Sequence, residues 1–324
     1  MKTLRIVSIL LLVVLLVTLG AGCGQPATKF PEKPITLVVQ ASAGGGSDIF
    51  ARTLAAGFEK GKLLSQPVVV ENKAGGSGAI AYAYTAGKKG DPYFLQTVVA
   101  TFLTTALQGK STVSYKDFTP IANFAFDEYV LFVKADSKFK TVKDLVAEAK
   151  AKPKDVKVSG AELGGSDSIC VYLLEKATGA KFNYIAFPGG GEAIAAVLGG
   201  HVDFGMANPG EAMELYKAGK VRLLGVYSEK RLAGAPDLPT MKEQGIDVVY
   251  VQNRGIVAPL DIPADARKVV EDAMLKYYNG ETFKKYITDN FLTGAWMDGP
   301  TFGKWLETEN GRYATILKDM GLIK

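Results

Sequence analysis

Short apolar runs alternate with longer amphipathic runs along most of this chain of 324 residues. The short runs are typical of strands, and the longer runs space their apolar residues as a helix does. Strands are expected at 35–39, 68–71, 94–99, 121–133, 156–159, 183–186, 202–206, 223–227 and 248–258. Helices are expected between them, most clearly at 48–60, 141–151, 166–178, 191–198 and 265–279. This alternation predicts an α/β fold with parallel strands and helical crossovers.

Two of the extended runs, 121–133 and 248–258, are longer than a typical strand of about five or six residues. We interpret them as paired connectors between two lobes, because the chain is also longer than a comfortable single core. The first lobe is then discontinuous, 34–124 with 253–324, and the second lobe is 125–252. A ligand is expected in the crevice between the carboxyl ends of the two sheets. Two sequential domains are the alternative interpretation.

A glycine-rich turn joins the first expected strand to the first expected helix. Residues 41–48 read Ala-Ser-Ala-Gly-Gly-Gly-Ser-Asp. Consecutive glycines let a backbone approach a ligand closely, and the first amides of a helix have no intrahelical partners. Such a turn binds an anion, for example a carboxylate, without any cationic side chain. Ser47 or Asp48 is expected to cap the helix.

Other glycine clusters occupy similar places. Phe187-Pro-Gly-Gly-Gly191 follows one expected strand and opens a helix, and 159–167 repeats this design. Each cluster alone is as compatible with a purely structural turn as with a ligand-binding turn. The recurrence of such clusters favours a ligand-binding site. The run 72–78 is also glycine-rich and precedes an expected helix at 79–86, but it lacks the order of a phosphate loop. No turn matches the dinucleotide fingerprint, so nucleotide binding is disfavoured.

The amino-terminal residues have the pattern of an export signal. Lys2 and Arg5 supply a positive start, 6–19 is apolar, and 20–23 consists of small residues ending in Cys23. The apolar stretch is short for a membrane span, so we expect 1–22 to be removed and Cys23 to be lipidated. Gly20 stands where a lipobox usually has leucine, and ordinary cleavage nearby is the alternative. Residues 23–33 are expected to form a tether to the membrane surface.

The amino-acid composition argues against several kinds of partner and site. The formal net charge is +5, with no basic cluster, so no nucleic-acid partner is expected. His201 is the only histidine, and Cys170 is the only cysteine besides Cys23. We therefore expect no intrachain disulfide, no metal site and no cofactor, and we expect Cys170 to be a buried, inert thiol. His201 is expected at an exposed turn, and no nucleophile and base have the spacing that an enzyme needs.

Five segments, in order, carry a resemblance to a known family. They are 30–39 with the turn to Asp48, 68–75, 184–191, 198–203 and 255–259. With these segments the chain resembles substrate-binding proteins of the tripartite tricarboxylate transporter family, the TctC or Bug type. The resemblance implies a two-lobed type II periplasmic binding protein fold, in which each lobe is a mostly parallel sheet flanked by helices. It also implies that the lobes close on a carboxylated metabolite.

The resemblance further implies two opposed glycine loops that hold carboxylate oxygens through backbone amides and ordered water. We call residues 42–48 the first loop and residues 188–191 the second loop. The binding residues implied for them are Ser42, Ala43, Gly44, Gly45, Gly46, Ser47, Asp48, Pro188, Gly189, Gly190 and Gly191. Asp48 is expected either to cap the helix or to accept a hydrogen bond from the ligand. Thr101, Ser166 and Asn208, just beyond expected strands, are expected to add side-chain hydrogen bonds.

The chain departs from the family near its second connector. Many members carry Asn-Trp-Arg-Gly there, whereas this chain reads Gln252-Asn-Arg-Gly255. An aromatic wall residue is thus replaced by Asn253, so the ligand preference of those members does not transfer. Arg254 is expected either to meet a second carboxylate of the ligand or to form a structural salt bridge.

These observations predict a receptor that does no covalent chemistry. We expect an exported, monomeric protein in the periplasm or on the cell surface, anchored to the membrane by lipid. It is expected to capture a small organic carboxylate and deliver it to integral-membrane transporter subunits. The alternative is a carboxylate sensor that presents its ligand to a membrane signalling receptor.

Overall fold

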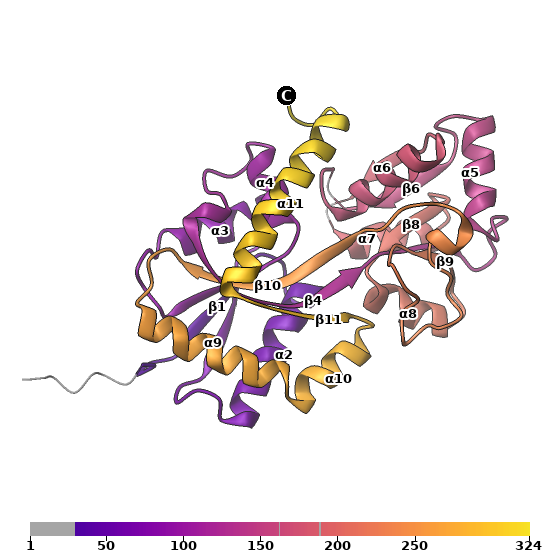
Figure 1. Ribbon diagram of the computed structural model, residues 1–324. Helices are drawn as coiled ribbons and strands as arrows, with labels where there is room; N and C mark the ends of the chain where they lie inside the picture. The colour runs from indigo at the N-terminus through magenta and orange to yellow at the C-terminus, as the bar shows by residue number, and fades with distance from the viewer. Residues whose placement is uncertain (1–29, 162, 188) are drawn as a thin grey trace, which may run out of the picture.

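The protein forms two lobes that lie side by side, each built on a mixed sheet with helices around it (Figure 1). The structure is a computed structural model that describes residues 30–161, 163–187 and 189–324. The predicted signal segment, Cys23 and Pro188 lie outside the described residues. The prediction of a two-lobed α/β fold is confirmed, but each sheet is mixed and not mostly parallel as expected.

The first lobe contains a sheet with the strand order β11-β4-β10-β3-β1-β2. β1 pairs in parallel with β2 and β3, whereas β10 runs antiparallel to β3 and β4. Its strands are β1 (Ile35–Val39), β2 (Val68–Asn72), β3 (Phe94–Val98), β4 (Phe118–Glu128), β10 (Val251–Pro259) and β11 (Thr293–Asp298). Its helices are α2 (Gly46–Gly61), α3 (Ala79–Ala86), α4 (Thr101–Leu107), α9 (Ala264–Tyr278), α10 (Glu281–Asp289) and α11 (Gly299–Asp319).

The second lobe contains a sheet with the strand order β7-β6-β8-β5-β9. β6 pairs in parallel with β7 and β8, and β5 runs antiparallel to β8 and β9. Its strands are β5 (Val130–Lys134), β6 (Lys157–Gly160), β7 (Asn183–Ala186), β8 (Phe204–Ala207) and β9 (Val221–Val226). Its helices are α5 (Val142–Ala151), α6 (Ser166–Thr178), α7 (Gly190–Leu198) and α8 (Pro209–Lys217).

Local sequence signals set the ends of several elements. Thr141 accepts from the Asp144 amide and Asp144 accepts from the Thr141 amide, so a capping box starts α5. Gly179 ends α6 in the left-handed conformation, with φ of 74°, which glycine adopts without steric cost. β1 is almost wholly buried because helices cover both faces of its sheet, which explains its continuous apolar sequence.

Two antiparallel strands connect the lobes. β4 and β10 pair along their length, from Val251 opposite Glu128 to Pro259 opposite Phe118. The expected extended run 121–133 divides at Tyr129 into β4 of the first sheet and β5 of the second. β4 and β10 both continue beyond the lobe boundaries expected at 124/125 and 252/253, so the first sheet is longer than the sequence suggested.

Aromatic residues hold the lobes together beside these connectors. The rings of Tyr129 and Tyr250 lie 5.7 Å apart, and the Tyr250 hydroxyl lies 3.1 Å from the Tyr313 hydroxyl of α11. The end of α11 also reaches the second lobe, because Asp319 accepts from Lys176 of α6 at 2.7 Å. Figure 1 shows α11 beside the connectors. In the described part of the chain, every helix is too short or too polar to cross a membrane.

Candidate functional site

The first loop is fixed by a buried carboxylate. Asp48 is 2 % exposed and accepts hydrogen bonds from the Gly44 amide at 2.8 Å, Arg52 Nε at 2.9 Å and Asn72 Nδ2 at 2.9 Å. Burial alone would raise the pKa of Asp48, but these donors outweigh burial and lower it. Asp48 therefore stays ionised and holds the loop. The expectation that Ser47 or Asp48 caps α2 is wrong, because the helix begins at Gly46 and Gly45 is its N-cap.

Two amides at the start of α2 are left without an acceptor. The Gly45 amide donates to the Ser42 carbonyl at 3.3 Å, and the Gly44 amide is bound by Asp48. Among the described residues, no acceptor is found for the amides of Gly46 and Ser47. Unpaired amides at a helix N-terminus, together with the helix dipole, favour an anion. The first loop thus presents the donors that a carboxylate needs.

A buried ion pair lies against the same loop. Arg254 of β10 donates through Nε to Asp127 of β4 at 3.0 Å, and the two residues are 5 % and 1 % exposed. Arg254 Nη1 also donates to the Ser47 hydroxyl at 3.3 Å, and a Cβ atom on Gly46 would lie 2.6 Å from Nη2. Burial opposes the charge of Arg254, but Asp127 raises its pKa and keeps it ionised. Of the two roles expected for Arg254, the structure shows the salt bridge.

The second loop has carboxylates rather than a cation beside it. α7 begins at Gly190, and its N-cap, Gly189, has no side chain that could accept from the first helix amides. A Cβ atom on Gly189 would lie 3.0 Å from Glu192 Oε2, and one on Gly190 would lie 3.3 Å from Glu211 Oε2. The side chain of Glu211 is solvent-exposed, but partial desolvation together with the nearby Asp167 and Asp127 raises its pKa to about 7.

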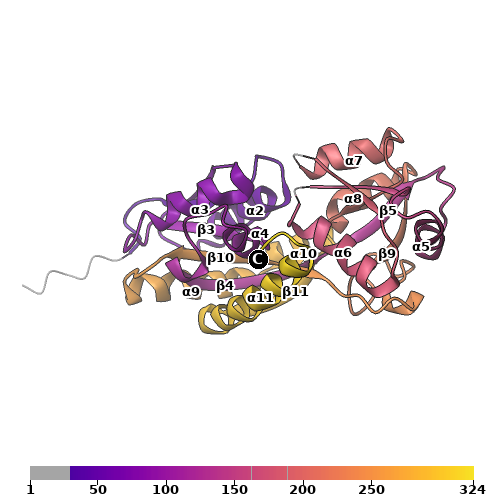
Figure 2. The ribbon, with the colours of Figure 1, turned by 90° about the horizontal axis from the view of Figure 1, so that it is seen from above.

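The two loops belong to one region between the lobes. The segments that lead into α6 and α7 face the first lobe (Figure 2). Asp127 pairs with Arg254 beside the first loop, and its charge also acts on Glu211 beside the second loop. Asp127 of the connectors is therefore near enough to interact with both Arg254 and Glu211.

Comparison with known proteins identifies the family. The family model of the tripartite tricarboxylate transporter family receptor, TctC, matches residues 50–322. The chain belongs to this receptor family. It is 31 % identical over 301 residues to a Cupriavidus necator protein, "UPF0065 protein in gbd 5'region", and the match covers 92 % of this chain and 90 % of that protein. The members are periplasmic solute-binding receptors, not a class of enzyme.

Solved structures share the receptor's fold. The periplasmic binding protein BugD is 25 % identical, with a TM-score of 0.82 and coverage of 91 % of this receptor and 100 % of BugD. MatC from Rhodopseudomonas palustris, solved with bound malate, is 23 % identical, with a TM-score of 0.78 and coverage of 89 % of this receptor and 100 % of MatC. At this identity the likeness to MatC shows the fold alone.

The three rim residues expected to bind ligand make hydrogen bonds within the receptor. Thr101 Oγ1, at the start of α4, lies 3.0 Å from the Tyr82 hydroxyl. Ser166 is buried, donates to Gln252 Oε1 at 3.1 Å and accepts from the Tyr250 hydroxyl at 2.9 Å. Asn208 Nδ2 lies 3.4 Å from the Glu128 carbonyl. These contacts place Ser166 and Asn208 near the connectors, but Ser166 already has two hydrogen-bond partners.

Asp127 and Glu211 were not predicted from the sequence. Asp127 is one of two adjacent acids in an otherwise apolar connector, which is a recognisable signal for a buried ion pair. Glu211 lies in the first turn of α8, where Asn208 is the N-cap and Pro209 the first helical residue. This segment is one more strand-to-helix turn, but it carries one glycine instead of three, so the glycine pattern did not find it.

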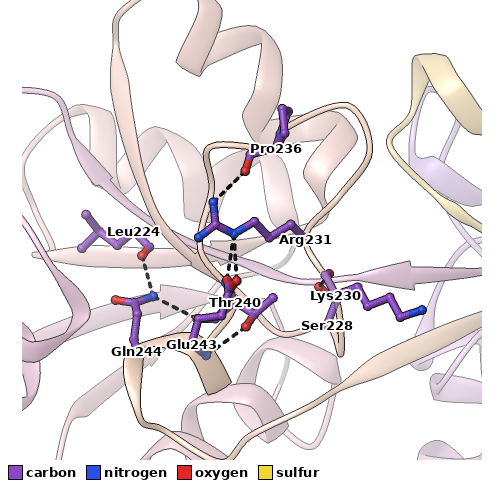
Figure 3. Close-up of polar contacts among 8 residues, drawn as sticks. All are labelled: Leu224, Ser228, Lys230, Arg231, Pro236, Thr240, Glu243 and Gln244. Atoms are coloured by element: carbon purple, nitrogen blue, oxygen red, sulfur yellow. Dashed lines mark hydrogen bonds and ion pairs between the residues drawn. The ribbon is translucent and has the colours of Figure 1, made fainter.

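The receptor also has a cavity away from the predicted site. Its volume is about 770 Å³, and it lies between the connectors, the loop after β9 and the segment from α10 to β11. The lining is mainly apolar and contains none of the predicted binding residues. Figure 3 shows that Arg231 of this loop is already bonded to the Glu243 carboxylate and the Pro236 carbonyl, while Lys230 extends away from these contacts.

The residues considered for chemistry do not form a reactive centre. Cys170 is fully buried, and burial raises the pKa of its thiol well above the ordinary value, so the prediction of a buried thiol is confirmed. His201 is exposed and follows α7 at a turn, as expected. Within the part of the chain that the structure describes, no group of three or more histidine, cysteine or acidic residues is placed to hold a metal ion.

Proposed function

We propose that the receptor captures a small organic carboxylate between its first and second loops and delivers it to integral-membrane subunits of a tripartite tricarboxylate-type transporter. The observation that carries this proposal is the pair of free amides at Gly46 and Ser47, at the N-terminus of α2. The binding step is non-covalent. The ligand binds when the lobes close on it, and it leaves when they open.

The electrostatics of the first loop support recognition by amides. Its two nearby cations are both paired, Arg52 with Asp48 at 2.9 Å and Arg254 with Asp127. Because these charges largely cancel, the attraction for an anion comes from the amides and the dipole of α2. MatC was solved with malate, and this supports a ligand of the same chemical class.

We also propose how the receptor reaches its partner. A lipid on Cys23 would hold it at the membrane surface, and residues 24–29 would act as the tether, which is shorter than expected because Phe30 and Pro31 contact the first lobe. The anchor keeps the receptor close to the transporter, which raises its effective concentration there. Metabolic labelling with a palmitate analogue tests this step: wild type should be labelled, and a Cys23→Ser variant should not.

The first loop is tested by a Gly45→Val variant. A Cβ atom on Gly45 would meet only Ser42 O at 3.4 Å and Ala41 Cβ at 3.9 Å, and its φ is −77°, so the fold should persist. The branched side chain stands beside the free amides and should block the ligand. A thermal-shift screen of di- and tricarboxylates, aromatic acids and amino acids first identifies a ligand. Calorimetry should then show at least about a hundredfold weaker binding in the variant.

A matched control separates loss of the site from loss of fold. Gly311 lies in α11, and a Cβ atom there would meet nothing within 4 Å. Gly311→Val therefore adds the same side chain to open space far from the loop, and its affinity should equal that of wild type. Equal affinity in wild type and in a folded Gly45→Val variant would remove the first loop from the binding site.

A further inference from the structure

The two loops are flanked by different charged groups. The Arg254 guanidinium lies against Gly46 of the first loop. In contrast, the carboxylates of Glu192 and Glu211 lie against Gly189 and Gly190 of the second loop. A ligand that spans both loops therefore meets free amides and a guanidinium already paired with Asp127 at one end, and carboxylates at the other.

Glu211 is the acid best placed to meet a ligand. The groups with the largest effect on its charge are Asp167 of α6, Asp127 of β4, Arg254 of β10 and the backbone of Asn208. Among these groups of the described residues, Arg254 is the sole cation, and it already pairs with Asp127. Glu214, one turn later in α8, instead has its own partner, Lys217, at 2.9 Å. Glu211 thus has no cation of its own among these groups, and its exposed carboxylate is accessible to a ligand.

A second acceptor in the same region also lacks a donor. Asp127 is 1 % exposed, and its Oδ2 atom accepts from Arg254. Its Oδ1 atom has no hydrogen-bond partner among the described residues. A buried acceptor without a donor is costly, and a bound donor group or an ordered water relieves that cost. The region between the loops therefore offers more acceptors than the receptor itself satisfies.

We propose that the ligand is an amino carboxylate, with its carboxylate on the amides of the first loop and its ammonium group facing Glu211 at the second loop. This inference rests on the proposed function, because it assumes that the first loop holds the carboxylate. A second carboxylate in place of the ammonium would lie against Glu211 and Glu192 and be repelled, whereas an ammonium gains charge-assisted hydrogen bonds.

Matched ligands test this inference. The probes are α-amino and ω-amino acids, each paired with the hydroxy acid or dicarboxylate of the same carbon skeleton, and affinities are measured by calorimetry with the purified receptor near pH 8. We expect at least one amino acid to bind about tenfold or more tightly than its paired probe. If the probes that bind are all hydroxy acids or dicarboxylates, the inference is wrong.

A variant pair assigns the preference to Glu211. Glu211→Gln keeps the size of the side chain and removes its charge, and Glu214→Gln makes the same change one helical turn away. Glu211→Gln should lose about tenfold or more in affinity for the amino acid and gain affinity for the paired dicarboxylate, while Glu214→Gln should match wild type. An unchanged amino acid preference in Glu211→Gln would contradict the role of this residue.

Failure of this inference differs from failure of the proposed function. If dicarboxylates bind best and Gly45→Val abolishes their binding, the receptor still captures carboxylates through the first loop. In that case only the inferred ammonium group of the ligand is wrong. If Gly45→Val leaves every bound probe unaffected, or if no carboxylate of either class binds wild type, the carboxylate site itself is wrong.

Discussion

The first and second loops are alike in sequence but are supported in opposite ways. Both place glycines between a strand and a helix. In the first loop, Asp48 binds the Gly44 amide and a guanidinium lies against Gly46. In the second loop, carboxylates lie against the glycines. The comparison teaches that glycine spacing identifies a loop that can approach a ligand, whereas residues far away in the sequence decide which charge it favours.

The largest expected effect comes from removing the cation behind the first loop. Arg254→Ala would leave the carboxyl group of Asp127 unpaired and 1 % exposed, at a site where burial already raises its pKa. Breaking a buried pair from one side costs about 3–5 kcal/mol, because one charge loses its compensation. Urea unfolding followed by circular dichroism should show a loss of this size in the free energy of unfolding.

An exposed ion pair is the control for Arg254→Ala. Lys268 pairs with Asp272 at 2.8 Å on the surface of α9, and its side chain is 73 % exposed. Lys268→Ala should change the free energy of unfolding by no more than about 0.5 kcal/mol, because exposed pairs are screened by solvent. Similar losses in the two variants would mean that the Arg254–Asp127 pair does not stabilise the connectors.

A smaller loss in the free energy of unfolding is expected when the hydrogen bonds that Asp48 accepts at the first loop are weakened. Asp48→Asn keeps the shape of the side chain but removes the charge that receives three donors, and it should cost about 2 kcal/mol at neutral pH. The pKa of Asp48 is lowered in the folded receptor, so its contribution is present above the ordinary value of 3.8 and is lost as the pH falls below it. Unfolding curves of variant and wild type should therefore differ at pH 7 and converge in acid.

Asp272→Asn is the matched control for this pH dependence. Its carboxylate is exposed on α9, so the same chemical change should leave the free energy of unfolding within about 0.5 kcal/mol of wild type at each pH. A difference between Asp48→Asn and wild type that stays constant into acid would show that the charge of Asp48 is not what holds the loop.

Glu211, beside the second loop, predicts a pH dependence of the affinity for the ligand. The pKa of Glu211 is raised to about 7, so this group is mostly neutral below that pH and ionised above it. An ammonium ligand favours the ionised form, and its affinity should rise about tenfold from about pH 6 to about pH 8. Calorimetry across this range should give a flat profile for Glu211→Gln. The same slope in both proteins would place the titrating group elsewhere.

Sequence predicted the scaffold and the first loop better than the surroundings of the second loop. The ends of α6 were predicted correctly, because Gly179 and the apolar spacing are local signals. The connectors were found from their length, although β4 and β10 extend further than expected. Asp127 and Glu211 were missed because their meaning depends on contacts between segments far apart in the chain. Ser166 was expected at the rim but is buried, since Tyr250 and Gln252 approach it from the second connector.

The smallest expected effects test whether each loop needs glycine for its backbone. Gly44 has φ of 83°, so Gly44→Ala should cost about 1 kcal/mol from backbone strain, although a Cβ atom there meets nothing within 4 Å. Gly191 lies in α7 without a positive φ, and a Cβ atom there also meets nothing within 4 Å. Gly191→Ala should therefore raise the free energy of unfolding by about 0.5 kcal/mol, because alanine favours the helix. Urea unfolding of both variants measures the difference, and a loss of stability in Gly191→Ala would show that the second loop is as constrained as the first.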